Sequence, residues 1–226
     1  MNMKKILILV WCWIFTFFCY FANTGLAQGY PERFDVIIDI GHGGVDGGTS
    51  AYGVLEKELN LQIGKRLYER LISQGYNVGM TRVRDYALSD DNRQPIRSRH
   101  LRDLTQRKLI ADALDPKVFI SLHMNWSGHH RTRGPLVIYQ ANQKSYSLAH
   151  LLQQHLNTLY GIEKKPSRGR TYFLMKHLQM PSVIVELGYL SNAQDFTMVR
   201  DNKFQQQLAD TIAHAVGEYF LLYPVE

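Results

Sequence analysis

Short runs of apolar and β-branched residues recur along the chain and predict the buried strands of a sheet. Turn-forming residues flank these runs, which is typical of strands that are covered on both faces. We expect strands at residues 34–40, 77–81, 118–122, 134–140 and 182–185.

Between these runs, apolar residues recur at every fourth position and predict amphipathic helices. The clearest case is the segment at residues 56–74, which Gly75 is expected to end. Its apolar stripe consists of Leu59, Ile63, Leu67 and Leu71. Similar patterns predict helices at residues 101–113, 145–160 and 204–220. Polar segments without this period are expected to be loops, at residues 85–98 and 164–169.

The alternation of strands and helices defines the expected fold class. It predicts an α/β fold, with a single domain whose mostly parallel central sheet is flanked by helices on both faces. A length of 226 residues and an apolar fraction of 45% suit one globular domain with a sizeable core. No internal repeat divides the chain.

The N-terminus carries a different pattern. Lys4 and Lys5 precede an unbroken apolar run at residues 6–21, and small residues occur just before position 28. This is typical of a signal peptide at residues 1–27, cleaved after Ala27, with an uncleaved membrane anchor as the alternative. The protein is therefore expected to be exported, either secreted or attached to the cell envelope by this segment alone.

The two cysteines, Cys12 and Cys19, both lie in this N-terminal segment. The exported domain therefore has no disulfide and no thiolate ligand. Any metal ion in it must be bound by histidine and carboxylate side chains.

The positive charge of the chain is concentrated in one region. Removing residues 1–27 lowers the net charge from +6 to about +4, and much of the remainder lies in residues 82–108. Tyr86 is its one Phe, Tyr or Trp residue, so no series of stacking aromatics interleaves this cluster, and nucleic acid is not an expected partner. We interpret the cluster as a solvated face or as a weak attractor of an anionic envelope polymer. Within it, Arg107 is expected either to contact substrate or to form a structural ion pair.

Four side chains suited to metal chemistry lie near the carboxyl ends of predicted strands, which is where an open α/β sheet binds ligands. His42, His123 and Glu186 follow predicted strands, and Glu56 opens the helix at residues 56–74. Open α/β sheets bind ligands beyond the carboxyl ends of their strands. Two imidazoles and a carboxylate leave one position of a tetrahedral zinc ion open for water, and a second carboxylate can take that water's proton. The same donors also suit other divalent metals.

Alternatives exist for both carboxylates. A helix N-terminus favours the ionised form of Glu56, but Glu58 is a rival ligand nearby. Glu186 could instead be a salt-bridged acid, although burial at a strand end without a functional partner is costly. The glycines around His42 would let backbone and substrate approach a metal closely. The other histidines are interpreted as surface or core residues, namely His100, His129, His130, His150, His155, His177 and His214.

Four short motifs follow one another along the chain. They are GHGG at residues 41–44 with Asp46 and Gly47, Gly53 with the pair Glu56 and Lys57, SLHMN at 121–125, and VELGYLSN at 185–192. In this order and spacing they resemble the zinc-dependent N-acetylmuramoyl-L-alanine amidases of the Amidase_3 family, of the AmiC and CwlD type. The similarity extends roughly from Asp35 to Phe220.

The resemblance implies a function for each motif. His42, Glu56 and His123 look like zinc ligands, and Glu186 looks like the catalytic carboxylate. The implied catalytic domain, residues 33–223, would hydrolyse the amide between N-acetylmuramic acid and the L-alanine of the stem peptide in peptidoglycan. Asn125 is expected to help orient this substrate.

The chain departs from the family pattern in a few places. Ile40 stands where a proline commonly precedes the Gly-His pair. Residues 61–121 are too short a stretch for the long helix with which some division amidases block their own zinc, and no separate wall-binding domain remains. These features favour the compact amidases of spore-cortex maturation and germination. Alternatives are a zinc peptidase that cuts within the stem peptide and a catalytically silent wall-binding or regulatory module, and the need for an accessory protein stays open.

Overall fold

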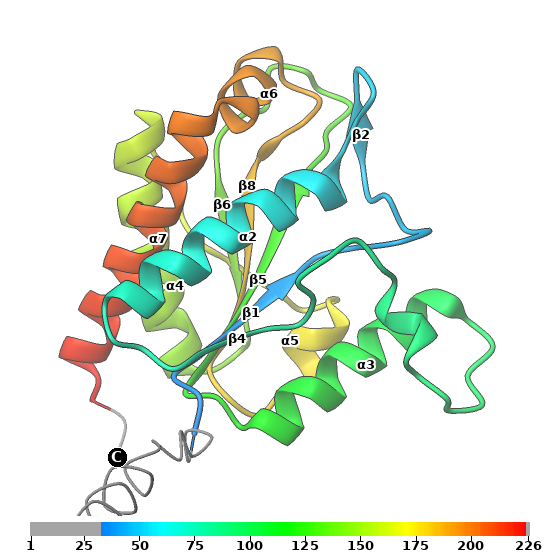
Figure 1. Cartoon of the computed structure of the whole chain (residues 1–226). Coiled ribbons are helices and arrows are strands. Elements are labelled where there is room, and N and C mark those ends of the chain that lie inside the picture. The colour runs from blue at the N-terminus through cyan, green and yellow to red at the C-terminus, as the bar shows by residue number, and fades with distance from the viewer. Residues whose placement is uncertain (1–32, 225–226) are drawn as a thin grey trace, which may run out of the picture. The chain divides into compact units, whose positions relative to one another are not determined.

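A six-stranded sheet forms the centre of the fold (Figure 1). The computed structural model describes residues 33–224, so the predicted signal peptide lies outside the described residues. The strands lie in the order β4 (Val78–Met80), β1 (Val36–Ile40), β5 (Val118–Asn125), β8 (Ser182–Tyr189), β6 (Leu136–Tyr139) and β7 (Ser167–Arg168). The first four are parallel, whereas β6 runs antiparallel to β8. The predicted mostly parallel sheet is therefore confirmed.

Helices cover both faces of this sheet (Figure 1). One face packs against α2 (Glu56–Ser73), α4 (Gln143–Tyr160) and α7 (Asn202–Leu222). The other face packs against α3 (Arg99–Leu114) and α5 (Phe173–His177). Because successive residues of a strand point to opposite faces, Ile38 joins the first apolar cluster and Ile37 the second. Within the described range, no helix has both the length and the apolar character needed to cross a membrane.

Several elements differ from those the sequence pattern predicts. A hairpin of β2 (Ser50–Ala51) and β3 (Val54–Leu55), the helix α5, and the helix α6 (Ala193–Arg200) are additional. The predicted loop at residues 85–98 includes a 3-10 turn, η1 (Leu88–Asp90), and the loop at 164–169 includes β7. Strands β5 and β8 continue beyond their predicted ends. His123 and Glu186 therefore lie inside strands rather than after them.

Candidate active site

The loop that follows β1 requires glycine where other side chains converge. His42 itself has a left-handed backbone, with φ of 61°, and Gly48 has φ of 68°. A Cβ on Gly48 would lie 2.5 Å from Glu56 Oε2, and one on Gly41 would lie 2.5 Å from the His123 ring. The glycines therefore leave the space in which His42, Glu56 and His123 meet.

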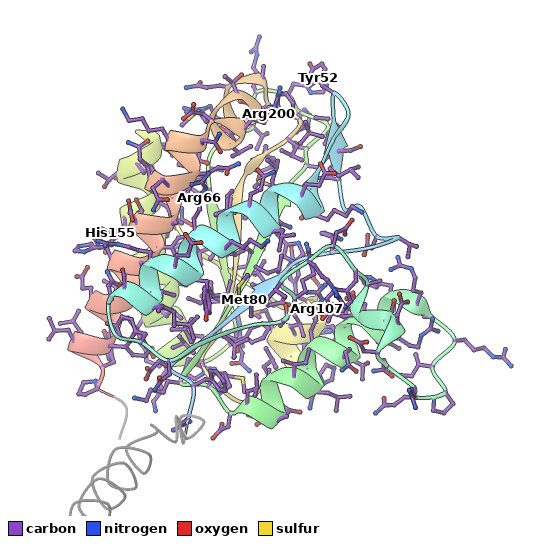
Figure 2. The ribbon with its side chains drawn as sticks, in the orientation of Figure 1. Tyr52, Arg66, Met80, Arg107, His155 and Arg200 are labelled. Atoms are coloured by element: carbon purple, nitrogen blue, oxygen red, sulfur yellow. The ribbon has the colours of Figure 1, made fainter. Side chains whose placement is uncertain are left out.

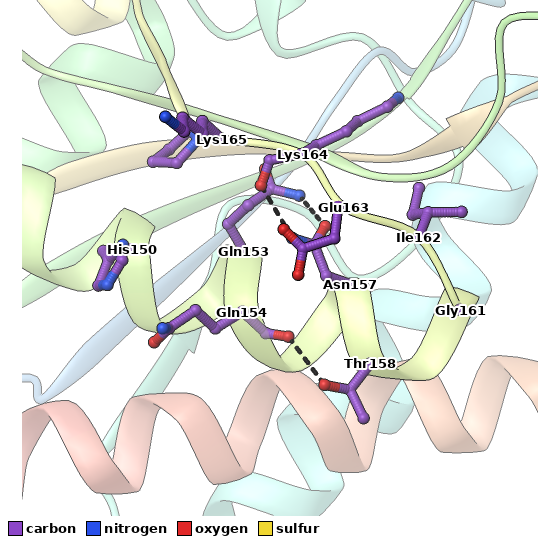
Figure 3. Close-up of a pocket in the computed structure, with 11 residues that line it drawn as sticks. His150, Gln153, Gln154, Asn157, Thr158, Gly161, Ile162, Glu163, Lys164 and Lys165 are labelled. Carbon is purple, nitrogen blue, oxygen red and sulfur yellow. Dashed lines mark hydrogen bonds between the residues drawn. The ribbon is translucent and has the colours of Figure 1, made fainter.

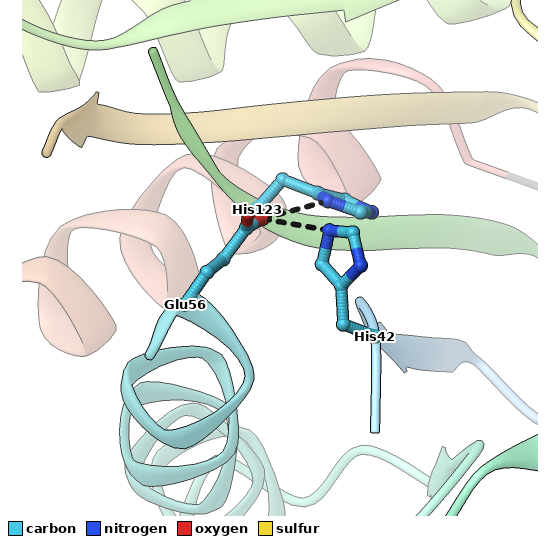
Figure 4. Close-up of side chains that lie close together, drawn as sticks. All are labelled: His42, Glu56 and His123. Carbon is cyan, nitrogen blue, oxygen red and sulfur yellow. Dashed lines mark hydrogen bonds and ion pairs between the residues drawn. The ribbon is translucent and has the colours of Figure 1, made fainter. Parts of the chain in front are cut away.

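Two imidazoles approach one carboxylate oxygen at this loop (Figure 4). Glu56 Oε1 lies 3.1 Å from His42 Nε2 and 3.0 Å from His123 Nδ1. The two rings meet edge to face, with centroids 4.9 Å apart. The structure thus brings together three of the side chains that the sequence singled out, and their donor atoms all lie within 4.8 Å of one another.

Glu56, rather than Glu58, points into this cluster. It is 2% exposed, whereas Glu58 is exposed to solvent. The backbone N–H of Thr49 donates to its Oε2 at 2.8 Å, and that of Met124 donates to its Oε1 at 2.9 Å. Burial raises the pKa of Glu56, but hydrogen bonds from His123 and His42 outweigh it and hold the pKa well below its usual range. The carboxylate is therefore ionised at neutral pH.

His42 is oriented by a second acid. Its Nδ1 lies 3.1 Å from Asp46 Oδ1, while its Nε2 faces Glu56. Burial lowers the pKa of His42, but its hydrogen bonds and ion pairs with Asp46 and Glu56 raise it to about 9. Since an imidazole binds a metal only in its neutral form, a cation at this site would have to displace a proton. The sequence reasoning assigned no role to Asp46 beyond its place in the motif.

Glu186 lies next to this cluster. It stands opposite His123 across the paired strands β8 and β5. The residue is 8% exposed, and its Oε2 has no hydrogen-bond partner among the described residues. Burial raises the pKa of Glu186 to about 7. A carboxylate with this pKa is suited to accept and return a proton near neutral pH. Within residues 33–224 it forms no salt bridge, which was the alternative explanation for this acid.

The interpretation of the basic segment as a solvated face is wrong for two of its arginines. Arg82 and Arg107 are 1% and 3% exposed. Arg107 forms a salt bridge to Asp39 at 2.5 Å, so the structural ion pair is the outcome for this residue. Both guanidinium groups also donate to backbone carbonyls of the loop: Arg107 to that of His42 at 3.1 Å, and Arg82 to that of Gly41 at 3.1 Å. Their function is to hold the loop in place.

Asn125 is the last residue of β5, two positions beyond His123. Its side-chain oxygen accepts a hydrogen bond from the Trp126 N–H at 2.8 Å, and its backbone carbonyl accepts one from Leu190 at 2.9 Å. These contacts fix the strand end beside the site. A contact of Asn125 with substrate stays a prediction.

The donor set fits a divalent metal ion. Two ligands at about 2.0–2.2 Å from a tetrahedral zinc ion lie roughly 3.3 Å apart. The distances of 3.1 and 3.0 Å from Glu56 Oε1 to His42 Nε2 and His123 Nδ1 are close to this value. Glu186 Oε2 has no hydrogen-bond partner among the described residues and lies next to the cluster. This is where we expect a group that acts on water rather than on the ion.

A separate hollow lies at the carboxyl end of α4 (Figure 3). Its volume is about 690 Å³, and it is lined by polar residues of α4 and by the following segment, residues 161–166. The side-chain amide of Asn157 donates a hydrogen bond to the Lys164 carbonyl at 2.8 Å and so links the two segments that line the hollow. None of its lining residues belongs to the His42, Glu56 and His123 cluster.

The fold and this cluster place the chain in a class of α/β proteins, those with a candidate metal site at the carboxyl ends of the strands of a mostly parallel sheet. Residues 36–218 match the model of the Amidase_3 family, described as N-acetylmuramoyl-L-alanine amidase. The chain belongs to this family. The resemblance indicated by the four motifs is therefore confirmed, and so is the assignment of the chain as an N-acetylmuramoyl-L-alanine amidase.

Individual relatives agree with this assignment. The chain is 29% identical over 187 residues to the germination-specific N-acetylmuramoyl-L-alanine amidase of Bacillus subtilis, covering 82% of this chain and 79% of the relative. It is similar in structure to the CwlD amidase of Clostridioides difficile, solved in complex with the GerS lipoprotein, with a TM-score of 0.77 and 28% identity over 84% of this chain and 100% of that one. The catalytic domain of CwlV from Bacillus (Paenibacillus) polymyxa gives a TM-score of 0.71 at 28% identity, over 83% of this chain and 98% of that domain.

Proposed function

We propose that this chain is an exported, zinc-dependent amidase that hydrolyses the bond between N-acetylmuramic acid and the L-alanine of the stem peptide. The observation that carries the proposal is the convergence of His42, Glu56 and His123 within 4.8 Å, beside the buried carboxylate of Glu186, whose Oε2 has no hydrogen-bond partner among the described residues. Two imidazoles and one carboxylate are a common ligand set of catalytic zinc sites, which keep one position open.

In this mechanism each side chain has a distinct role. His42, Glu56 and His123 would hold the ion, which, when bound, supplies polarisation of the amide carbonyl and increased acidity of water. Asp46 keeps the His42 ring in its orientation through Nδ1. Glu186 accepts the proton of the attacking water and delivers it to the amine nitrogen of L-alanine as the amide bond breaks.

Substrate positioning is assigned to the strand ends around the site. Asn125 lies on β5, two residues from His123, and its hydrogen bond to Trp126 holds the chain that leaves the strand. We propose that the Asn125 amide contacts the stem peptide. The half-exposed indole of Trp126 stands next to it on the surface.

The proposed location follows from the substrate and the N-terminal segment. Peptidoglycan lies outside the cytoplasmic membrane, and residues 1–27 have the charge and apolar pattern of a signal peptide. We therefore assign residues 1–27 to export, with an uncleaved anchor as the alternative, and residues 33–223 to the catalytic domain.

A role in spores is the finer proposal. The similarity to a germination-specific amidase of Bacillus subtilis supports cortex peptidoglycan as the substrate. The CwlD amidase of Clostridioides difficile was solved with a lipoprotein bound, which supports an accessory protein for this chain as well.

The test is digestion of purified peptidoglycan, from vegetative walls and from spore cortex, by residues 28–226 with and without added zinc. Mass spectrometry would identify the released fragments. The proposal expects free stem peptides that begin with L-alanine, and only when zinc is present. Fragments cut within the stem peptide would instead establish a zinc peptidase. An absence of fragments from both substrates with metal-loaded protein would leave two explanations, a missing accessory protein or a silent wall-binding module.

A further inference from the structure

A second group of metal-binding side chains lies outside the active site, on the helices α4 and α7. It consists of His155, His214 and Glu218, and Figure 2 labels His155 at the surface of this helix pair. Among residues 33–224, this set and the active-site cluster are the two groups of at least three such side chains whose donor atoms lie within 4.8 Å of one another.

The geometry of this second group is compact. His155 Nε2 lies 2.6 Å from Glu218 Oε2. The imidazole of His214 meets that of His155 edge to face, at 89° and with ring centroids 4.9 Å apart. A hydrogen-bonded pair of His155 and Glu218 explains the first contact alone. This pair does not explain why the imidazole of His214 also lies beside it.

Rigid elements hold these three side chains. His214 and Glu218 are four residues apart on α7, so they project from the same side of that helix. His155 comes from α4, whose apolar residues share a core with those of α7. Sites built on packed helices are more precise than sites built on loops. The cluster also joins positions 63 residues apart in the chain.

We propose that His155, His214 and Glu218 bind a second zinc ion, or a similar divalent transition metal, that clamps α4 to α7. Two imidazoles and one carboxylate are donors that zinc accepts in four-coordinate sites. The side chains of His155 and Glu218 are 30% and 36% exposed, so an ion can enter from solvent and water can complete its coordination. Because the unfolded chain does not hold these donors together, the bound ion stabilises the folded state.

The experiment counts ions in the purified full chain. After removal of metal with a chelator, the wild type and the His214→Ala variant are dialysed against zinc, and bound zinc is measured by elemental analysis. The proposal expects the variant to hold one ion fewer per chain. The matched control is His150→Ala, which removes another exposed histidine of α4 that stacks on Tyr146 and should leave the count unchanged.

Thermal unfolding gives the second readout. With free zinc at about 100 times the dissociation constant of this site, zinc should raise the Tm of the wild type by roughly 5–10 °C more than that of His214→Ala. Glu218→Gln keeps a hydrogen-bond acceptor for His155 but loses the charge, and it should also hold one ion fewer. Equal zinc counts in the wild type and both variants would overturn the proposal. The comparison is a difference between chains that share the active-site cluster, so it holds whether or not that cluster binds zinc.

Discussion

Arg107 donates a hydrogen bond from Nη2 to the backbone carbonyl of His42 at 3.1 Å, although the two residues are 65 positions apart. The same guanidinium donates to the Ile40 carbonyl at 2.7 Å and to the carboxylates of Asp39 and Asp103. A helix on one face of the sheet thus fixes the backbone on which a candidate metal ligand stands. We therefore expect metal binding and folding stability to be coupled through this one side chain.

Replacing Arg107 tests this coupling. Arg107→Met leaves the buried carboxylate of Asp39 without its cation, and loss of one partner of a buried pair costs about 3–5 kcal/mol. We expect a lower free energy of unfolding in urea and weaker zinc binding, because the His42 loop loses its support. Lys108→Met is the control, since Lys108 forms a surface ion pair with Asp112. Equal zinc affinity in a folded Arg107→Met protein would contradict the positioning role.

Separate variants distinguish ion binding from proton transfer at the active site. We expect His42→Ala and His123→Ala to lose the active-site ion, one ion per chain, together with turnover. Glu186→Ala should keep the metal but lower turnover by roughly 10²–10⁴-fold, the usual contribution of a general base. Metal content by elemental analysis and release of stem peptides measure the two properties. Glu58→Ala, at the exposed neighbour of Glu56, is the control, and normal turnover by Glu186→Ala would remove its assigned role.

The fold was accessible from sequence where elements are long enough to show a period. Helix α2 carries four buried leucine or isoleucine side chains, one at every fourth position, and this period identified the helix from the sequence. Helix α5, with five residues, and the hairpin of β2 and β3 are too short to show a period. Their positions depend on contacts with the rest of the fold.

The site was only partly accessible. His42 and Glu56 stand at the two ends of one glycine-rich loop, so their proximity could be inferred locally. The position of Glu186 opposite His123 depends on the pairing of β5 with β8, which periodicity does not specify. Arg82 was assigned to a solvated face with its basic neighbours because basic residues are usually exposed, and for Arg107 a substrate contact and a structural ion pair were both left open. Asp39, inside an otherwise apolar strand, was the available signal, because a buried carboxylate needs a cation nearby.

Two loop glycines with the same backbone requirement differ in their surroundings. Both Gly48 and Gly53 have positive φ, so an alanine at either position is strained by about 1–3 kcal/mol. A Cβ at Gly48 would also lie 2.5 Å from Glu56 Oε2, whereas none of the described atoms lies within 4 Å of one at Gly53. We expect Gly48→Ala to weaken zinc binding and Gly53→Ala to leave it nearly unchanged. Isothermal titration with zinc measures both, and equal affinities would argue against the steric role of Gly48.

Acid should destabilise the protein through Asp39. Burial raises the pKa of this carboxyl, but the charge of Arg107 and the hydrogen bond from Ser121 outweigh it and hold the pKa below its usual value. A depressed folded-state pKa contributes stability that is present above the unfolded value, about 3.9, and is lost as the pH falls through the folded value. We therefore expect the Tm to fall below about pH 4. The fall should be shallower in Asp39→Asn than in the wild type, whereas Asp112→Asn, at a surface ion pair, should follow the wild type. Parallel Tm profiles for Asp39→Asn and the wild type between pH 5 and pH 2 would assign the acid sensitivity to other groups.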